Sequence, residues 1–373
     1  NYSMHYSNLL IFKLNYTLVQ SISTRFFEIR QMSGMKMETS KALLYKGYGE
    51  PTDVLEVVTE NIEQPSKGQV SVKWLMSPVN PADINTIQGK YPSKPPLPAV
   101  AGNEGVGEIA AVGPGVTNFQ IGDRVIPNGV NKGTWRVLAN YSADAMLKIP
   151  KDMGLIEASM LNVNPCTAYR MLKDFVPLKP GDTVIQNGGN SAVGQMVIQL
   201  CKIWNYKSVN IVRDRPDIDE LKNQLKCMGA DEVLTEAEAR TTNIFKESKL
   251  PAPKLAFNCV CGKSGSYTMK HLAYGGTMVT YGAMSREPVI APASAFIFQD
   301  ATLKGFWMTA WTNANLESRE RQTMLSELGE FFKSKKLQAP PYKVVPFDEY
   351  KEAVMNALNP KGQTGIKYIL DMS

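Results

Sequence analysis

The spacing of hydrophobic and polar positions changes between the first part of the chain and the rest. Three early segments, 41–45, 55–59 and 69–76, alternate apolar with polar residues or are rich in β-branched residues. A period of two is typical of strands that bury one face. Six glycines follow between residues 102 and 122, where tight turns between further strands are expected. This part of the sequence predicts a compact, β-barrel-like domain with short helices.

From residue 165 onward, the pattern predicts alternating helices and strands. A first helix is expected over 165–175, because Pro165 is suited to its first turn. The expected strands are 183–187, 208–212, 232–234, 255–260, 276–281 and 302–308. The expected helices are 191–204, 217–228, 236–247 and 265–272. Strands that are connected through helices pair in parallel, so this order predicts a doubly wound Rossmann sheet and an α/β fold class.

The C-terminal segment has a mixed pattern, with expected helices over 318–333 and 348–358 and expected strands over 342–345 and 367–370. We expect this tail to return to the first domain. The predicted organisation is a β-barrel catalytic domain made of residues 38–162 and 311–373, and a Rossmann domain made of residues 163–310.

Residues 1–37 differ from the rest of the chain. They contain five serines, four basic side chains and a single acidic one. This composition is typical of a mitochondrial transit peptide. The alternative is an upstream extension, with translation beginning at Met4, Met32, Met35 or Met37. In either case we exclude the segment from the fold.

Bulk composition describes an ordinary soluble protein with about two domains, since 43% of its 373 residues are hydrophobic and 20% are charged. The formal net charge is +6, half of it from residues 1–37. No basic run suggests a nucleic-acid partner. No apolar stretch reaches the roughly 18 residues of a membrane span. The five cysteines include no C-x-x-C pair, which favours free thiols in a reducing compartment.

The two histidines, His5 and His271, limit the possible chemistry. His5 lies in the N-terminal segment, and His271 lies late in a predicted helix. A catalytic zinc site needs several Cys, His or acidic ligands close together, and the sequence shows no such cluster. A hydrolase triad would depend on His271, which adjoins no nucleophile motif. We therefore expect no metal in the site.

The segment 187–194 (NGGNSAVG) connects a predicted strand to a predicted helix. Glycines after a strand let the backbone approach a pyrophosphate, and the first turn of the helix offers unpaired N–H groups to it. The next strand ends in Arg213-Asp214-Arg215. Two arginines around one aspartate favour the 2′-phosphate of NADPH over the free ribose of NADH. The alternative is a glycine-rich turn followed by a solvated charge cluster.

Several segments resemble the medium-chain dehydrogenase/reductase superfamily and, within it, the mitochondrial trans-2-enoyl-thioester reductases. These segments are 78–85 (PVNPADIN), 87–92 (IQGKYP), 102–105 (GNEG), 163–170 (VNPCTAYR), 212–216 (VRDRP), 276–282 (GTMVTYG) and 303–307 (LKGFW). The likeness runs from about residue 41 to 371. It implies a GroES-like β-barrel catalytic domain and a Rossmann domain that binds NADPH.

The resemblance also implies roles for individual residues. Tyr91 corresponds to the family's catalytic tyrosine, the proton donor. Asn164 and Thr167 correspond to residues beside the nicotinamide. The other implied cofactor contacts are Asn190, Ser191, Ala192, Val193, Gly194, Arg213, Asp214, Arg215, Tyr281, Gly282, Ala283, Met284, Phe306, Trp307, Met308, Thr309 and Lys367. Ala192, Ala283 and Cys261 stand where glycine is expected in relatives.

The implied activity is the NADPH-dependent reduction of trans-2-enoyl thioesters, carried by coenzyme A or an acyl-carrier protein, in fatty acid synthesis in the mitochondrial matrix. A homodimer is implied as well. From the residues alone, Tyr91 could instead be an aromatic anchor in a proline-rich loop. Two other functions stay open. One is a zinc-free NADPH quinone oxidoreductase, and the other is a non-catalytic NADPH-binding protein that recognises another macromolecule.

Overall fold

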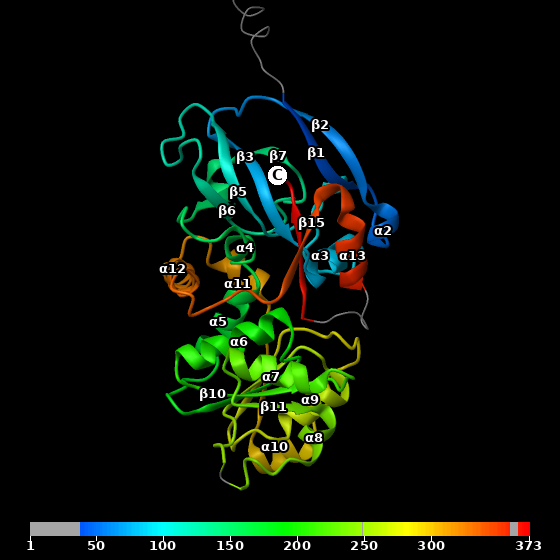
Figure 1. Ribbon diagram of the computed structural model, residues 1–373, viewed down its shortest axis with the longest axis vertical. Helices are drawn as coiled ribbons and strands as arrows, with labels where there is room; N and C mark the ends of the chain where they lie inside the picture. Colours follow the sequence, from blue (N-terminus) through cyan, green and yellow to red (C-terminus); the bar gives the residue numbers. More distant parts are fainter. Residues whose placement is uncertain (1–37, 248, 359–364) are drawn as a thin grey trace, which may run out of the picture.

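The computed structural model describes residues 38–247, 249–358 and 365–373. The predicted N-terminal segment, residues 1–37, lies outside the described part, as do residues 359–364 of the C-terminal tail. Figure 1 shows two bodies along the long axis, with most β-strands at one end and a helix-covered sheet at the other.

Two sheets form the β-rich end. A three-stranded sheet has the order β2-β1-β4, and a larger one has the order β15-β16-β3-β5-β6-β8, with β7 also paired to β3. Their bounds are β1 Glu38–Tyr45, β2 Glu56–Ile62, β3 Gln69–Pro78, β4 Ala99–Val100, β5 Val106–Val112, β6 Arg124–Pro127, β7 Leu138–Ser142, β8 Met146–Lys148, β15 Tyr342–Pro346 and β16 Lys367–Asp371. Trp74 and Trp135 are fully buried in the core of this end. The C-terminal strand β16 lies antiparallel to β3, with Leu370 opposite Ser77.

The other end contains a six-stranded parallel sheet in the order β11-β10-β9-β12-β13-β14, which is a doubly wound Rossmann order. The bounds are β9 Thr183–Asn187, β10 Lys207–Val212, β11 Glu232–Thr235, β12 Leu255–Asn258, β13 Thr277–Thr280 and β14 Thr302–Gly305. The α/β class with a GroES-like and a Rossmann part is therefore confirmed. The domain boundaries at 162/163 and 310/311 stay a prediction.

Helices connect and cover the sheets. Their bounds are α2 Pro51–Val54, α3 Pro81–Ile87, α4 Leu155–Ser159, α5 Asn164–Asp174, α6 Ala192–Ile203, α7 Ile218–Met228, α8 Glu236–Thr241, α9 Gly262–Met269, α10 Ala293–Gln299, α11 Met308–Ala314, α12 Arg319–Lys333 and α13 Tyr350–Leu358. One apolar core joins α5, α6 and α12 to strands β9 and β12. Across the described ranges, no helix has the length and apolarity that a membrane crossing needs.

The structure differs from the predicted pattern at several elements. The strand predicted over 302–308 ends at Gly305, where its neighbour β13 also ends, so no partner continues the ladder. Helix α11 follows instead. Helix α8 stops at Thr241, because Thr242 takes an extended backbone conformation. Helix α10 was not predicted, and α3 is one of the short helices predicted for the β-rich domain without a range. For α3 a signal exists, since Asn80, Pro81 and Asp83 form a capping box with proline in the first turn.

The parallel sheet determines where the candidate cofactor residues lie. Ser191 follows β9, Arg213 follows β10, Tyr281 follows β13 and Phe306 follows β14. Because the strands are parallel, these carboxyl ends share one edge of the sheet, the edge at which doubly wound proteins bind ligands.

Candidate active site

A cavity of about 190 Å³ lies where the two bodies meet. The β-rich end contributes Asn80, Ala82, Asp83, Tyr91, Ser93, Asn103, Gly129, Val130 and Asn131. The rest of the lining consists of Asn162, Val163, Thr167, Val193, Tyr281, Phe306, Trp307, Met308, Thr309 and Thr312. Eight residues that the sequence singled out therefore share one cavity: Tyr91, Thr167, Val193, Tyr281, Phe306, Trp307, Met308 and Thr309.

Tyr91 and Trp307 form one wall of this cavity. The indole Nε1 of Trp307 donates a hydrogen bond of 2.7 Å to the Tyr91 hydroxyl, and the two rings meet edge to face with centroids 5.8 Å apart. The Tyr91 backbone N–H donates to the carbonyl of Asn85 in α3, which ties the loop to that helix. Because Trp307 donates, the tyrosine hydroxyl keeps its own proton for another acceptor.

Another part of the lining is polar and hydrogen-bonded. Asp83 accepts from the Asn80 backbone N–H (2.8 Å) and from Asn103 Nδ2 (2.7 Å). Asn103 Oδ1 accepts from the Asn131 backbone N–H at 3.0 Å. Asn131 Nδ2 donates to Ser93 Oγ at 2.9 Å. A continuous series of hydrogen bonds thus runs from buried Asp83 to the loop that carries Tyr91.

Two further charged groups lie buried behind this wall. Asn80 Nδ2 donates to Glu104 at 2.7 Å, and Lys367 Nζ donates to Asn80 Oδ1. Burial raises the pKa of Asp83 from 3.8 to about 6 and that of Glu104 from 4.5 to about 7, while the Lys367 charge opposes both shifts. Burial also lowers the pKa of Lys367. Two buried carboxyl groups, those of Asp83 and Glu104, therefore interact electrostatically with one buried ammonium group, that of Lys367.

The turn after β9 has the close packing expected of a pyrophosphate turn. Gly188 has φ +61°, and a Cβ there would lie 2.6 Å from Cys259 Sγ. A Cβ at Gly194 would lie 2.6 Å from the carbonyl oxygens of Gly188 and Gly189. Ser191 caps α6 by accepting from the Gly194 N–H at 3.1 Å. The first-turn N–H groups of Ala192 and Val193 have no partner within the helix and suit an anionic ligand.

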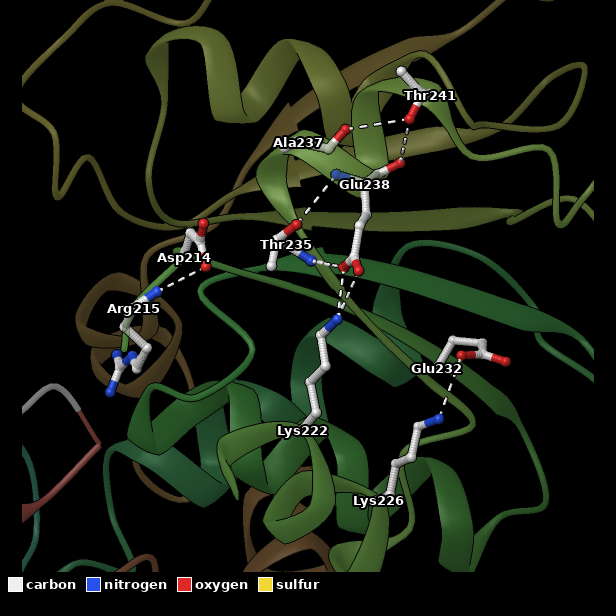
Figure 2. Close-up of polar contacts among 9 residues, drawn as sticks. All are labelled: Asp214, Arg215, Lys222, Lys226, Glu232, Thr235, Ala237, Glu238 and Thr241. Carbon is white, nitrogen blue, oxygen red and sulfur yellow. Dashed lines mark hydrogen bonds and ion pairs between the residues drawn. The ribbon is translucent and has the colours of Figure 1, made fainter. Parts of the chain in front are cut away.

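The end of β10 presents the predicted phosphate-binding residues. Asp214 accepts from the backbone N–H of Arg215, and Arg215 Nε lies 4.0 Å from Asp217. Figure 2 shows the side chain of Lys222 in α7 directed away from Asp214 and Arg215, to Glu238 at the start of α8. The Lys222–Glu238 distance is 2.8 Å. Lys222 thus connects α7 to α8.

Asn164 and Thr167 lie in the first turns of α5. Asn164 is 6% exposed, and its Nδ2 has no hydrogen-bond partner among the described residues. A buried amide with an unused donor fits a carboxamide such as that of nicotinamide. Asn164 itself does not line the cavity, although Val163 and Thr167 do. Thr167 Oγ1 donates to the Val163 carbonyl at 2.6 Å, so it can only accept from a ligand.

The remaining predicted contacts follow strands of the parallel sheet, except Lys367, which lies in β16. Asn190 is buried, and its carbonyl accepts from Gln195 Nε2. The segment Gly282-Ala283-Met284 follows β13, where the Met284 N–H donates to the Cys259 carbonyl. Lys367 is buried against Asn80 in this structure, and its predicted cofactor contact stays a prediction.

Cys261 illustrates a departure that the sequence indicated. Its φ of +70° lies in the region that favours glycine, and its Sγ donates to the Gly282 carbonyl at 3.3 Å. The thiol is 2% exposed. The Cys261 side chain is therefore closely packed beside the sheet edge where the cofactor is expected.

Sequence reasoning missed the polar wall. Ser93, Asn103 and Asn131 were not singled out as site residues, although Asn103 lies in the recognised GNEG segment. Asn131 follows a glycine-containing loop and has φ +56°, a conformation that asparagine tolerates better than most residues. The positive φ of Asn131 is a property of the folded backbone, so the sequence alone does not show it.

The comparisons with known proteins identify the family. The Alcohol dehydrogenase GroES-like domain model matches residues 66–151, and the Zinc-binding dehydrogenase model matches residues 192–329. The mitochondrial enoyl-acyl-carrier-protein reductase of Rattus norvegicus is 46% identical over 335 residues, which covers 89% of this chain and 88% of the relative. The chain belongs to the mitochondrial enoyl-acyl-carrier-protein reductases. This family is part of the medium-chain dehydrogenase/reductase superfamily.

Solved structures of enoyl reductases agree with the fold. The complex of Etr1p with NADP and crotonyl-CoA has a TM-score of 0.83 at 36% identity and covers 90% of this chain and 100% of that one. The Etr1p/Etr2p heterodimer of mitochondrial 2-enoyl thioester reductase from Candida tropicalis has a TM-score of 0.82, also at 36% identity and with the same coverage.

The matched model named for zinc raises the question of a metal. Over the ranges that the structure describes, no three His, Cys, Asp or Glu side chains are grouped so as to hold an ion. In this enoyl reductase, Lys367 is the cation that lies with Asp83 and Glu104.

Proposed function

We propose that this protein reduces trans-2-enoyl thioesters of coenzyme A or of an acyl-carrier protein to saturated acyl thioesters, with NADPH, in mitochondrial fatty acid synthesis. The observation that carries the proposal is the Tyr91 hydroxyl, which accepts from Trp307 on the wall of a cavity that also reaches Val193 in the pyrophosphate turn. Family membership and the Etr1p complex with NADP and crotonyl-CoA support it.

The residues proposed to hold NADPH fit the group. Asn190, Ser191, Ala192, Val193 and Gly194 form the pyrophosphate turn. Arg213, Asp214 and Arg215 bind the adenosine ribose and its 2′-phosphate. Asn164 and Thr167 bind the nicotinamide side, and the further contacts are Tyr281, Gly282, Ala283, Met284, Phe306, Trp307, Met308, Thr309 and Lys367. When bound, the cofactor supplies the hydride that the β-carbon of the substrate receives.

The chain itself manages the proton and the charge. The α-carbon of the substrate takes a proton from the Tyr91 hydroxyl, and the Trp307 N–H stabilises the oxygen that remains. The apolar part of the lining, formed by Val193, Phe306 and Met308, excludes water from the acyl chain.

The proposal is tested by following NADPH oxidation by the full chain with trans-2-enoyl-CoA substrates of increasing length and, in parallel, with a quinone. We expect turnover with the thioesters that exceeds turnover with the quinone. The reverse ranking would establish the quinone oxidoreductase. Tight NADPH binding without turnover of any conjugated acceptor would instead support a non-catalytic binding protein.

Replacing both arginines at the end of β10, as in Arg213→Ala together with Arg215→Ala, should weaken NADPH binding by about 10²-fold and leave NADH binding within about threefold of its original value. The reason is the loss of charge-assisted hydrogen bonds to the 2′-phosphate, which NADH lacks. The measurement is titration of each reduced cofactor by its fluorescence. Lys226→Ala is the matched control, because this exposed cation in α7 pairs with Glu232. Equal losses for both cofactors would contradict the assignment.

We also propose that the protein forms a homodimer through the free edge of β14. This strand lies at the end of the six-stranded sheet, and its four residues are exposed. Exposed Phe298, Ile297 and Leu303 lie on α10 and β14. An exposed edge strand beside exposed apolar side chains favours pairing with a second copy. The Etr1p/Etr2p heterodimer from Candida tropicalis supports an assembly of two subunits.

The protein acts in mitochondria, as the names of its relatives state for those enzymes. The composition of residues 1–37 supports a transit peptide, which we propose to be the function of that segment.

A further inference from the structure

The loop after α3 places two hydroxyl groups on the same wall of the cavity. Along residues 91–94, Tyr91 and Ser93 are partly buried, whereas Pro92 and Lys94 are exposed. Residues 91–93 form a bend, and the two side chains on its more buried side are those of Tyr91 and Ser93. Both Tyr91 and Ser93 line the cavity. The substrate space therefore meets a second O–H group beside the one already assigned to the α-carbon.

The Ser93 hydroxyl is oriented by the polar wall. Its oxygen accepts from Asn131 Nδ2 at 2.9 Å, and the Asn131 backbone N–H donates to Asn103, whose amide donates to Asp83. A serine hydroxyl has a single proton and two lone pairs. One lone pair accepts the hydrogen bond from Asn131 Nδ2, so the serine proton is available to an acceptor. Among the described residues, the hydrogen-bond partner of Ser93 Oγ is the donor Asn131 Nδ2, so a ligand in the cavity is the natural acceptor of the proton.

The substrate of the proposed function has one strong acceptor next to its reacting carbons, which is the thioester oxygen. We propose that Ser93 is a catalytic residue that donates a hydrogen bond to the thioester oxygen and stabilises the enolate. This inference rests on the proposed function and adds a specificity determinant, since it selects acceptors that have a carbonyl conjugated to the double bond.

The step balances without proton loss from Ser93. The β-carbon gains a hydride, and the electron pair of the carbon–carbon double bond moves to make a new double bond between the α-carbon and the carbonyl carbon. The carbonyl π pair then resides on the oxygen as negative charge. Ser93 shares its proton with that oxygen through a hydrogen bond, which strengthens as the charge develops. When the α-carbon takes the proton from Tyr91, the carbonyl re-forms and Ser93 keeps its proton.

Ser93→Ala should lower kcat with crotonyl-CoA about 10²-fold, as loss of one oxyanion donor does elsewhere. NADPH affinity should not change. Ser93→Thr, which retains a hydroxyl, should restore most of the rate.

Asn131→Gly should lower kcat by about 10-fold, because it removes the donor that orients Ser93. Glycine keeps the positive φ and the backbone N–H that donates to Asn103. The exposed Ser142→Ala is the matched control and should behave as wild type.

A binding experiment isolates the hydrogen bond from turnover. The wild-type protein with NADP⁺ should bind butyryl-CoA about 3- to 10-fold more tightly than its S-butyl thioether, which lacks the carbonyl. In Ser93→Ala this preference should disappear. If wild type reduces crotonyl-CoA but Ser93→Ala keeps both kcat and the thioester preference, the inference is wrong and the proposed function stands. If wild type reduces no enoyl thioester, the proposed function fails first. Should Ser93→Ala not fold, an unchanged kcat in Asn131→Gly would overturn the inference.

Discussion

Replacing Tyr91 with phenylalanine is expected to lower kcat for enoyl thioesters about 10²- to 10⁴-fold, the usual contribution of a positioned proton donor. The ring and its edge-to-face contact with Trp307 remain, so the cavity should keep its shape. Only the hydroxyl that accepts from Trp307 Nε1 is lost. Steady-state oxidation of NADPH with crotonyl-CoA measures kcat, and fluorescence titration measures the cofactor Kd, which we expect to stay within about twofold of wild type.

A matched variant separates a chemical role from an architectural one. Tyr48→Phe removes a hydroxyl from an exposed tyrosine whose ring is tilted against that of Tyr45 outside the cavity lining, and it should leave kcat unchanged. If Tyr91→Phe also kept near wild-type turnover with the same cofactor affinity, Tyr91 would be an aromatic anchor of its proline-rich loop and not the proton donor.

The sequence was most informative about segments whose chemistry is local. The glycine turn 187–194 lies between a strand and a helix in both the pattern and the structure, because the same short apolar and amphipathic runs determine both. The same holds for the strand that precedes Arg213. Parallel pairing then brings these segments to one sheet edge, so the side of the sheet that binds a cofactor follows from the order of elements alone.

Contacts between distant segments could not be predicted in this way. Tyr91 and Trp307 are separated by 216 positions, and Asn80 and Lys367 by 287. The contact of Asn80 with Lys367 depends on how the C-terminal strand β16 is placed beside β3. The contact of Tyr91 with Trp307 depends on how the two bodies meet. The pattern of residues within one short segment does not indicate where a distant segment will lie. The polar wall was missed for the same reason, since Asp83, Asn103 and Asn131 belong to three separate loops or helices and acquire a common role only when folded.

Lys367→Met should lower the free energy of unfolding by about 3–5 kcal/mol at pH 8, the usual cost of removing one charge from a buried set of opposite charges. Asp83 and Glu104 would remain buried without a cation. The folded state raises the pKa of Asp83 from 3.8 to about 6 and that of Glu104 from 4.5 to about 7. A carboxyl group whose pKa is raised in the folded state binds its proton more tightly there than in the unfolded chain. Its contribution to stability is therefore largest at low pH and is lost as the pH rises to about 7.

The loss in Lys367→Met should therefore be smaller at pH 5 than at pH 8, because the unpaired carboxyls take up protons. Urea unfolding at the two pH values measures the difference. Lys351→Met is the control, since this lysine is exposed on α13 and should change stability little at either pH. An equal loss at pH 5 and pH 8 would show that Lys367 stabilises by packing and not by charge. A separate fall in NADPH affinity, measured where the variant is folded, would show that the same ammonium group also reaches the cofactor.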